Sequence, residues 1–222
     1  MKKQLIIIFG LFSMLFLPPG MVAKTLTEAK VSQYQALLKK EQSKARRAKI
    51  LIILIKDAKA KKNHQSEIDF RQAFSKELQG IEQYNKTRLN NDFQLGILLF
   101  KNKRNEKARQ VFEQLYMELP ATTTKVRRIL LPYLVNLSQK SGIGIAEENY
   151  RRDYLHLMGS GLKVKTRDQY YRRLLIVGSD NGSGMEEIDM EAWLKDASPA
   201  QIVKRREILN ACLLSTSDAA DE

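Results

Sequence analysis

Side chains that commonly carry catalysis are few in this sequence and lie far apart. The two histidines, His64 and His156, are separated by 92 positions, and neither has ligand partners at the spacing of a metal site. His64 follows two lysines and an asparagine, which predicts an exposed helix end, and His156 is interpreted as a packed or half-exposed helix residue. Residues 180–184 (DNGSG) lack the series of oxygen ligands of a calcium loop and are predicted to form a flexible turn.

Motifs of the common enzyme classes are also missing from the sequence. It contains no nucleophile elbow, phosphate-binding loop or dinucleotide fingerprint. The neighbouring carboxylates at Glu147 and Glu148 are interpreted as solvated charges near a helix N-terminus, where the helix dipole favours them. We therefore predict no catalytic residue, no metal site and no cofactor within residues 24–211.

One segment, residues 92–120 (DFQLGILLFKNKRNEKARQVFEQLYMELP), has small, aromatic and proline residues where a helical hairpin needs them. Gly96 and Ala108 leave room for a neighbouring helix to approach closely, because neither carries a bulky side chain. Phe112 starts an apolar stripe that fills the space between layers, and Pro120 ends the second helix because it lacks an amide donor. The residues expected to pack this hairpin are Leu95, Gly96, Leu99, Ala108, Phe112, Leu115 and Pro120.

This pattern resembles the tetratricopeptide repeat, and the resemblance covers about residues 89–122. The segment departs from the family at two positions, because Asp92 stands where Trp is usual and Leu99 where Tyr is usual. An ordinary αα-hairpin with the same landmarks is the alternative interpretation. The resemblance implies an all-α fold of antiparallel helix hairpins stacked as an α-solenoid, whose inner groove binds another protein.

The resemblance also implies which side chains line that groove. The groove positions on the first helix of the hairpin are Asn90, Phe93, Gln94, Ile97, Phe100 and Lys101. Because Phe93 and Ile97 are apolar where carboxylate-binding relatives carry Lys and Asn, the expected guest is an apolar helix or extended segment, with Lys101 at the rim. The alternative is that the preceding helix, expected over residues 67–83, covers these side chains.

Helix signals dominate the rest of the chain, and the sequence shows no pair of strands that could form a sheet. The six branched apolar residues at 50–55 suit a buried strand or a helix, and we predict a helix because alanines extend the segment on both sides. Capping residues Thr25 and Ser66 are expected to open helices, and Pro132 is expected to kink the helix over residues 125–139. In total we expect about ten helices. The remaining ones lie at residues 25–43, 44–62, 146–158, 167–177, 190–195 and from 199.

The two ends of the chain predict export and truncation. Lys2, Lys3 and an apolar core at residues 5–17 indicate a signal peptide over residues 1–23, with an uncleaved membrane anchor as the alternative. We expect a helical domain at residues 24–177, a linker at 178–185 and further helices at 186–211. Residues 212–222 (CLLSTSDAADE) resemble a translated sequencing adapter, so the native chain is expected to continue beyond Ala211; a natural acidic tail is the alternative.

Positive charge is the strongest global feature. The chain contains 38 Lys and Arg against 25 Asp and Glu; two of these lysines precede residue 24 and three acidic residues follow residue 211, so residues 24–211 carry a net charge of +14. Recurring dibasic pairs predict a basic ridge across successive helices, made of Arg127, Arg128, Arg151, Arg152, Arg172 and Arg173. In an exported protein such a ridge would meet anionic lipid or cell-wall polymer rather than nucleic acid. The alternative is that the arginine stems cover apolar surface while their charged ends stay in water.

From the sequence we therefore expect an exported, periplasmic scaffold or adaptor that binds another envelope protein through a concave helical groove. One alternative is a basic module that binds an envelope polyanion or a membrane surface. Another is a helical accessory domain of a cell-envelope enzyme or outer-membrane barrel whose C-terminal part is missing.

Overall fold

A computed structural model describes residues 25–158 and 161–180, together with residues 191, 193–195, 202–203 and 205–207. Within these ranges the protein is all-α, as predicted, and contains no strand. It divides into two compact units, Met1–Asn91 and Asp92–Glu222, whose boundary falls inside helix α5 (Asn85–Lys101). The predicted signal peptide and the tail at 212–222 lie outside the described residues. None of the described helices is long and apolar enough to cross a membrane.

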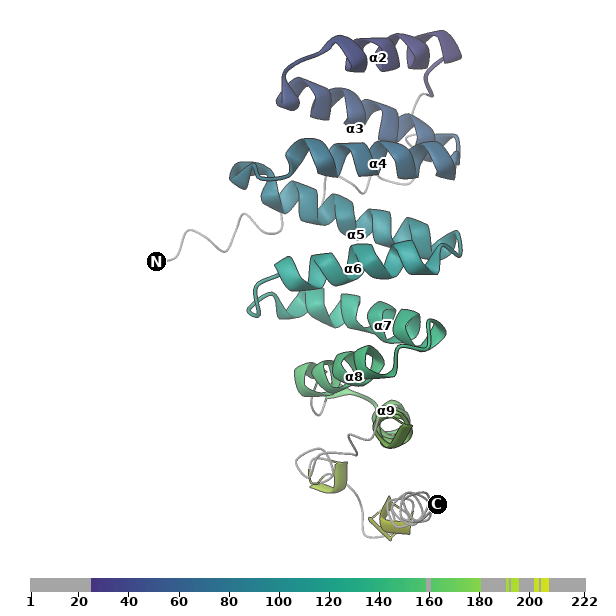
Figure 1. The fold of residues 1–222 in the computed structure, drawn as a ribbon, viewed down its shortest axis with the longest axis vertical. Helices are drawn as coiled ribbons and strands as arrows, with labels where there is room; N and C mark the ends of the chain where they lie inside the picture. The colour runs from purple at the N-terminus through teal and green to yellow at the C-terminus, as the bar shows by residue number, and fades with distance from the viewer. Residues whose placement is uncertain are drawn as a thin grey trace. The chain divides into compact units, whose positions relative to one another are not determined.

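The first unit holds α2 (Glu28–Lys40), α3 (Lys44–Ala60), α4 (His64–Leu78), the short 3₁₀ helix η1 (Glu82–Tyr84) and the beginning of α5. The second unit holds the rest of α5, then α6 (Asn105–Glu118), α7 (Thr124–Lys140), α8 (Gly144–Met158) and α9 (Val164–Asp180). Within the second unit each of α6, α7 and α8 packs on the helix that follows it. Figure 1 shows the α5–α6 and α7–α8 turns on one side of the second unit and the α6–α7 turn on the other. The run at residues 50–55 is helical, as predicted, and Leu51 and Leu54 within it are fully buried.

Several predicted helix boundaries are wrong because other residues act as caps. Thr27, not Thr25, caps α2, and α2 ends at Lys40 because Ser43 caps the next helix. Asn63 caps α4 by accepting a hydrogen bond from the backbone N–H of Ser66 at 3.1 Å. The helix expected over residues 67–83 ends at Leu78.

Helix α7 is continuous through Pro132, in agreement with the single helix predicted over residues 125–139, and the flanking Leu131 and Leu134 are anchored in the core. One boundary predicted in the second unit is wrong. The predicted linker begins too early, since Gly178 and Asp180 belong to the last turn of α9 and Gly178 is buried there. Residues 181–185 lie outside the part of the chain that the structure describes.

Four helices of 17 residues recur at nearly equal intervals, and we call α3, α5, α7 and α9 the long helices. They begin at residues 44, 85, 124 and 164, so the intervals are 41, 39 and 40 residues. The shorter helices between them, α4, α6 and α8, are called the return helices. This interval is longer than the 34 residues of a tetratricopeptide unit.

The turn from a long helix to a return helix has the same geometry three times. At its centre Lys62, Lys103 and Gly142 have positive φ values of 55°, 58° and 67°. In each turn the following N–H bonds back to a carbonyl five residues earlier, for example Arg104 to Leu99 at 3.0 Å. This is the hydrogen-bond pattern of a Schellman cap. The repeated turn therefore fixes the same reversal of direction in each hairpin.

Two residue types recur at fixed places in the long helices. The fourth residue is arginine in each (Arg47, Arg88, Arg127 and Arg167), and the eleventh is a buried leucine (Leu54, Leu95, Leu134 and Leu174). Arg47 donates to the Leu38 carbonyl at 2.9 Å, and Arg127 donates to the Leu119 carbonyl at 2.7 Å. These two arginines therefore satisfy carbonyl groups at the end of the preceding helix.

The fourth and eighth residues of each return helix are buried and occupy equivalent places. In α6 they are Ala108 and Phe112, both 0% exposed. In α4 and α8 the same places hold ion pairs, Glu67 with Arg71 at 2.8 Å and Glu147 with Arg151 at 2.7 Å. An apolar pair and two ionic pairs thus fill the same position in successive hairpins.

The α8 pair is part of a three-residue ionic cluster. Arg173 of α9 also donates to the two carboxylate oxygens of Glu147, at 3.0 and 3.2 Å. The interpretation of Glu147 and Glu148 as solvated charges is wrong, because they are 2% and 5% exposed. Burial raises the pKa of Glu147, but the hydrogen bonds and charges of Arg173 and Arg151 outweigh burial and lower it overall.

Close packing of Gly96 against Phe112 joins α5 to α6. A Cβ atom added to Gly96 would collide with the Phe112 ring, which has no exposed surface. We expect Gly96→Ala to lower the free energy of unfolding by about 1–3 kcal/mol, because overpacking outweighs the better helix propensity of alanine. Chemical denaturation followed by circular dichroism measures the change. In a Phe112→Leu background the same substitution should lose most of its penalty; an unchanged penalty would contradict this packing.

Acid should weaken the Glu147 cluster. The folded-state pKa of Glu147 lies below its ordinary value of 4.5, so the ionised carboxylate stabilises the fold above about pH 4.5, and this contribution is lost as the pH falls through the folded-state pKa. Glu147→Gln should therefore cost about 3 kcal/mol near neutral pH, and the difference from the unsubstituted protein should shrink toward pH 3. Unfolding curves between about pH 7 and pH 3 test this, with the exposed Glu82→Gln as the control. A penalty that does not vary with pH would refute the assignment.

Candidate functional site

The residues predicted to line a groove lie along α5. Partly buried members of the set are Phe93, Gln94, Ile97 and Phe100, and exposed members are Asn90 and Lys101. The spacing i, i+4, i+7 places Phe93, Ile97 and Phe100 on one face of the helix. The structure therefore brings the apolar members together at the surface of the second unit.

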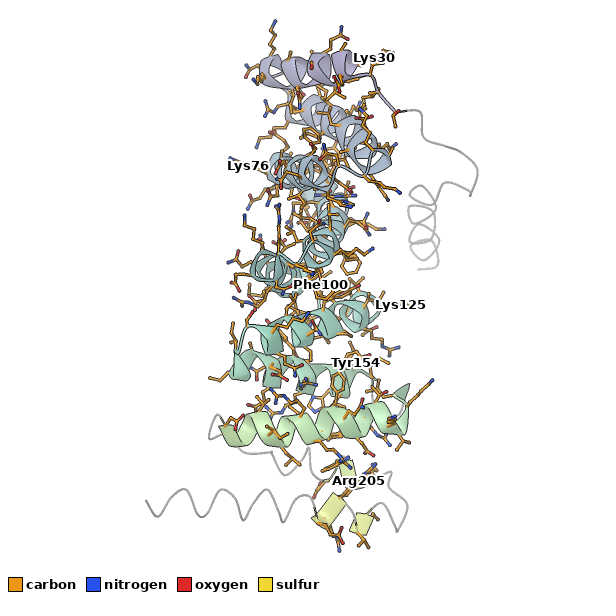
Figure 2. All side chains as sticks on the ribbon, turned by 90° about the vertical axis from the view of Figure 1, so that its right-hand side faces the viewer. Lys30, Lys76, Phe100, Lys125, Tyr154 and Arg205 are labelled. Atoms are coloured by element: carbon orange, nitrogen blue, oxygen red, sulfur yellow. The ribbon has the colours of Figure 1, made fainter. Side chains whose placement is uncertain are left out.

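Helices that follow α5 cover part of this face. The Phe93 ring centroid lies 6.1 Å from that of Phe112 on α6, and the Phe100 centroid lies 5.4 Å from that of Tyr133 on α7 in an edge-to-face arrangement. Tyr133 also lies 5.2 Å from Phe112. Figure 2 labels Phe100 within the side chains of the second unit. The aromatic rings thus link α5, α6 and α7, and Phe93, Phe100 and Tyr133 remain partly exposed.

Tyr133 was not predicted as a site residue, although its spacing carries a signal. It follows Ile129 by four residues on α7, so the two side chains lie on one face of that helix. Ile129 is 55% exposed and Val126, one turn earlier, is 37% exposed. We define the α5–α7 face as Phe93, Ile97, Phe100, Val126, Ile129, Pro132 and Tyr133.

Five of the seven residues predicted to pack the hairpin are buried. Leu95, Leu99, Ala108, Phe112 and Leu115 are all at most 3% exposed. Gly96 contacts Phe112, as described above, and Pro120 follows the end of α6 as an exposed residue. The α5–α7 face is therefore supported from below by a dense core.

The predicted basic ridge is discontinuous in the structure. Arg151 is 7% exposed and is bound to Glu147, and Arg173 reaches the same carboxylate. Arg152 pairs with Glu148 at 3.1 Å. Arg127 caps Leu119 and lies 4.4 Å above the Tyr116 ring. Arg128 and Arg172 are the exposed members. Most of these guanidinium groups therefore bind other groups of the protein. Neither a basic ridge nor charged ends that stay in water accounts for this.

A small open pocket of about 250 Å³ lies between α6, α7 and α8. Its polar lining comes from Tyr116, Arg127, Asp153 and His156. Tyr116 donates to an Asp153 carboxylate oxygen at 2.6 Å, and burial together with this hydrogen bond raises the pKa of Tyr116 to about 12. Deprotonation of this phenol is therefore harder than that of a tyrosine in water.

Nothing in the described residues assembles a metal site. No group of three or more His, Cys, Asp and Glu side chains lies close enough to hold a metal ion in residues 25–158 and 161–180 or in the short described stretches beyond. His64 is the exposed first residue of α4, as predicted, and His156 is exposed on α8 rather than packed.

No model of a protein family matches the chain, and no curated protein shows detectable sequence similarity to it.

The burial of an aromatic or apolar side chain predicts how strongly its substitution lowers the free energy of unfolding. Phe112→Ala should cost about 3–5 kcal/mol because its ring is fully buried. Ile129→Ser should change stability by about 0.5 kcal/mol or less, because its side chain is mostly in water. Denaturant titration measures both, with Thr87→Ala on the exposed side of α5 as the control. A large loss at Ile129 would mean that the α5–α7 face belongs to the core.

Proposed function

We propose that this protein is an exported, periplasmic scaffold or adaptor whose tetratricopeptide-like hairpins stack side by side and hold another protein on the α5–α7 face. The observation that carries this proposal is the stripe of accessible apolar side chains on adjoining long helices. Ile129 and Val126 expose apolar surface next to the half-buried rings of Phe100 and Tyr133. Contiguous apolar surface of this kind marks interaction sites in folded proteins.

The rigidity of the supporting core favours binding without rearrangement. Tyr133 is held by Phe100 and Phe112, and the backbone beneath it belongs to a 17-residue helix. Docking on this face costs the partner its own conformational entropy, but little further entropy is lost by ordering the scaffold. Side chains with few rotatable bonds, such as Phe and Tyr, reduce that penalty further.

Export rests on the first 23 residues of the sequence. Two lysines, an apolar core and a small residue at position 23 have the order of a secretory signal. In the periplasm the partner would be an envelope protein or a peptide from one. The absence of cysteine from residues 24–211 suits a domain held together by packing in an oxidising compartment.

Site-specific photo-crosslinking in living cells tests the proposal. A photoreactive phenylalanine analogue at Ile129 should form adducts with a discrete protein, because that position lies within the proposed contact. The same residue placed at Met117 or Ile145 on the return helices should not, although these positions are 77% and 66% exposed. Equal labelling at all three positions, or adducts with lipid or glycan alone, would contradict the proposal.

A further inference from the structure

Charge in this protein is segregated between the two kinds of helix. Each return helix carries two basic and three acidic residues. The long helices together carry 17 Lys and Arg against four Asp and Glu, and α7 has no acidic residue at all. The excess positive charge therefore lies on the long helices, and α5 and α7, which form the α5–α7 face, carry seven of these basic residues against one acidic residue.

Most basic residues of the return helices are paired with a carboxylate of the same helix, while Glu77 and Glu147 also bind Arg47 and Arg173 of long helices. Arg109 binds both Glu106 and Glu113 at 2.6 Å, and Glu147 with Arg151 and Glu148 with Arg152 form pairs one helical turn apart. On α7, by contrast, Lys125 and Lys140 are exposed at opposite ends of a helix without carboxylates. Figure 2 labels Lys125 at the start of α7. No acidic residue of α7 can therefore offset the charge of these two exposed lysines.

The position of the lysines is unfavourable for the isolated helices. None of the long helices has an acidic residue in its first turn, whereas each return helix has one. The second residue of α5, α7 and α9 is instead a lysine, namely Lys86, Lys125 and Lys165. The helix dipole disfavours a cation there by about 0.3–1 kcal/mol. A repeated local penalty of this kind is explained if the lysines serve binding rather than stability.

At the other end of the face, two more lysines are exposed. The Lys140 ammonium group lies 5.2 Å from the Phe100 ring centroid, and Lys101, which follows Phe100 at the end of α5, is exposed. Lys101 and Lys140 therefore lie at one end of the two helices that form the α5–α7 face, and the exposed Lys125 begins the other end of α7.

We propose that the α5–α7 face binds an acidic amphipathic segment of another protein, and this proposal rests on the proposed function above. Apolar side chains of the segment lie on Ile97, Ile129 and Tyr133, while its Asp and Glu side chains meet the lysines at the ends of α5 and α7. A polyanion without apolar groups would leave Ile129 and Val126 in water, so it matches only half of the surface. A segment that carries both features matches all of it.

The purified full chain and four fluorescent or labelled probes test this inference by anisotropy or co-sedimentation. The first probe is a helical peptide with leucine on one face and glutamate on the other. The second replaces its leucines by serine, the third replaces its glutamates by lysine, and the fourth is a vesicle of phosphatidylglycerol. We expect the first to bind at least about fivefold more tightly than either altered peptide, because both contact types contribute.

Variants locate the binding. Lys125→Glu combined with Lys140→Glu should weaken the first peptide by about tenfold, and Ile129→Ser should weaken it by a similar factor. Lys107→Glu, an exposed lysine on α6, is the matched control and should change binding by less than about twofold.

Three outcomes would overturn the inference. Equal affinity for the serine-substituted peptide would identify a polyanion site, and tight vesicle binding that Ile129→Ser and the lysine variants abolish would identify a membrane surface. If no acidic peptide binds while crosslinks from Ile129 to a protein persist in cells, the acidic chemistry is wrong but the scaffold function stands. Loss of those crosslinks would instead remove the scaffold function itself.

Discussion

The contact between each return helix and the long helix that follows it is the constraint on which the packing within each unit depends. In α6 this contact is made by Phe112, which lies against Gly96 of α5 and reaches Tyr133 of α7. No larger residue than glycine fits beneath the ring. The equivalent places in α4 and α8 hold Glu67–Arg71 and Glu147–Arg151, which also reach the next long helix: Arg71 donates to Asn91 at 3.0 Å, and Glu147 accepts from Arg173. In α6 one position thus sets both the pairing within the hairpin and the joint to the next helix, and in α4 and α8 the equivalent position reaches the next long helix.

The apolar residue and the ion pairs found at this position differ in the neighbours that they require on the next helix. An aromatic ring accepts any apolar neighbour of suitable size, so Phe112 tolerates changes in detail. A buried ion pair must be completed by further polar partners, because desolvation of two charges exceeds their mutual attraction otherwise. Asn91 and Arg173 are those partners. The ionic hairpins therefore specify which residue of the following helix must face them, and the apolar hairpin mainly contributes burial.

Sequence patterns revealed the apolar hairpin and concealed the ionic ones for the same physical reason. Gly96, Ala108 and Phe112 are small or large apolar residues at a known spacing, and such residues are buried by default. Glu147 and Arg151 are charged, and charged residues on a helix are usually solvated, so the sequence alone favoured the surface. Only the presence of Arg173 across the interface reverses that expectation, and its proximity is a tertiary fact. The interval of about 40 residues was missed similarly, because only an arginine and a leucine recur at fixed places in the long helices.

The candidate face was predicted in part, and the unpredicted part follows from helix continuity. The α5 residues Phe93, Ile97 and Phe100 were identified from their spacing, but their neighbours on α7 were not, because Tyr133 reaches Phe100 and Phe112 only through tertiary packing. Helix α7 survives Pro132 since its buried leucines hold both halves against α6 and α8. Continuity then carries Ile129 and Tyr133 to the same surface as Phe100, and carries Lys125 and Lys140 to its two ends. A broken α7 would separate these groups, so the integrity of this one helix decides whether the apolar and cationic parts of the face act on a single ligand.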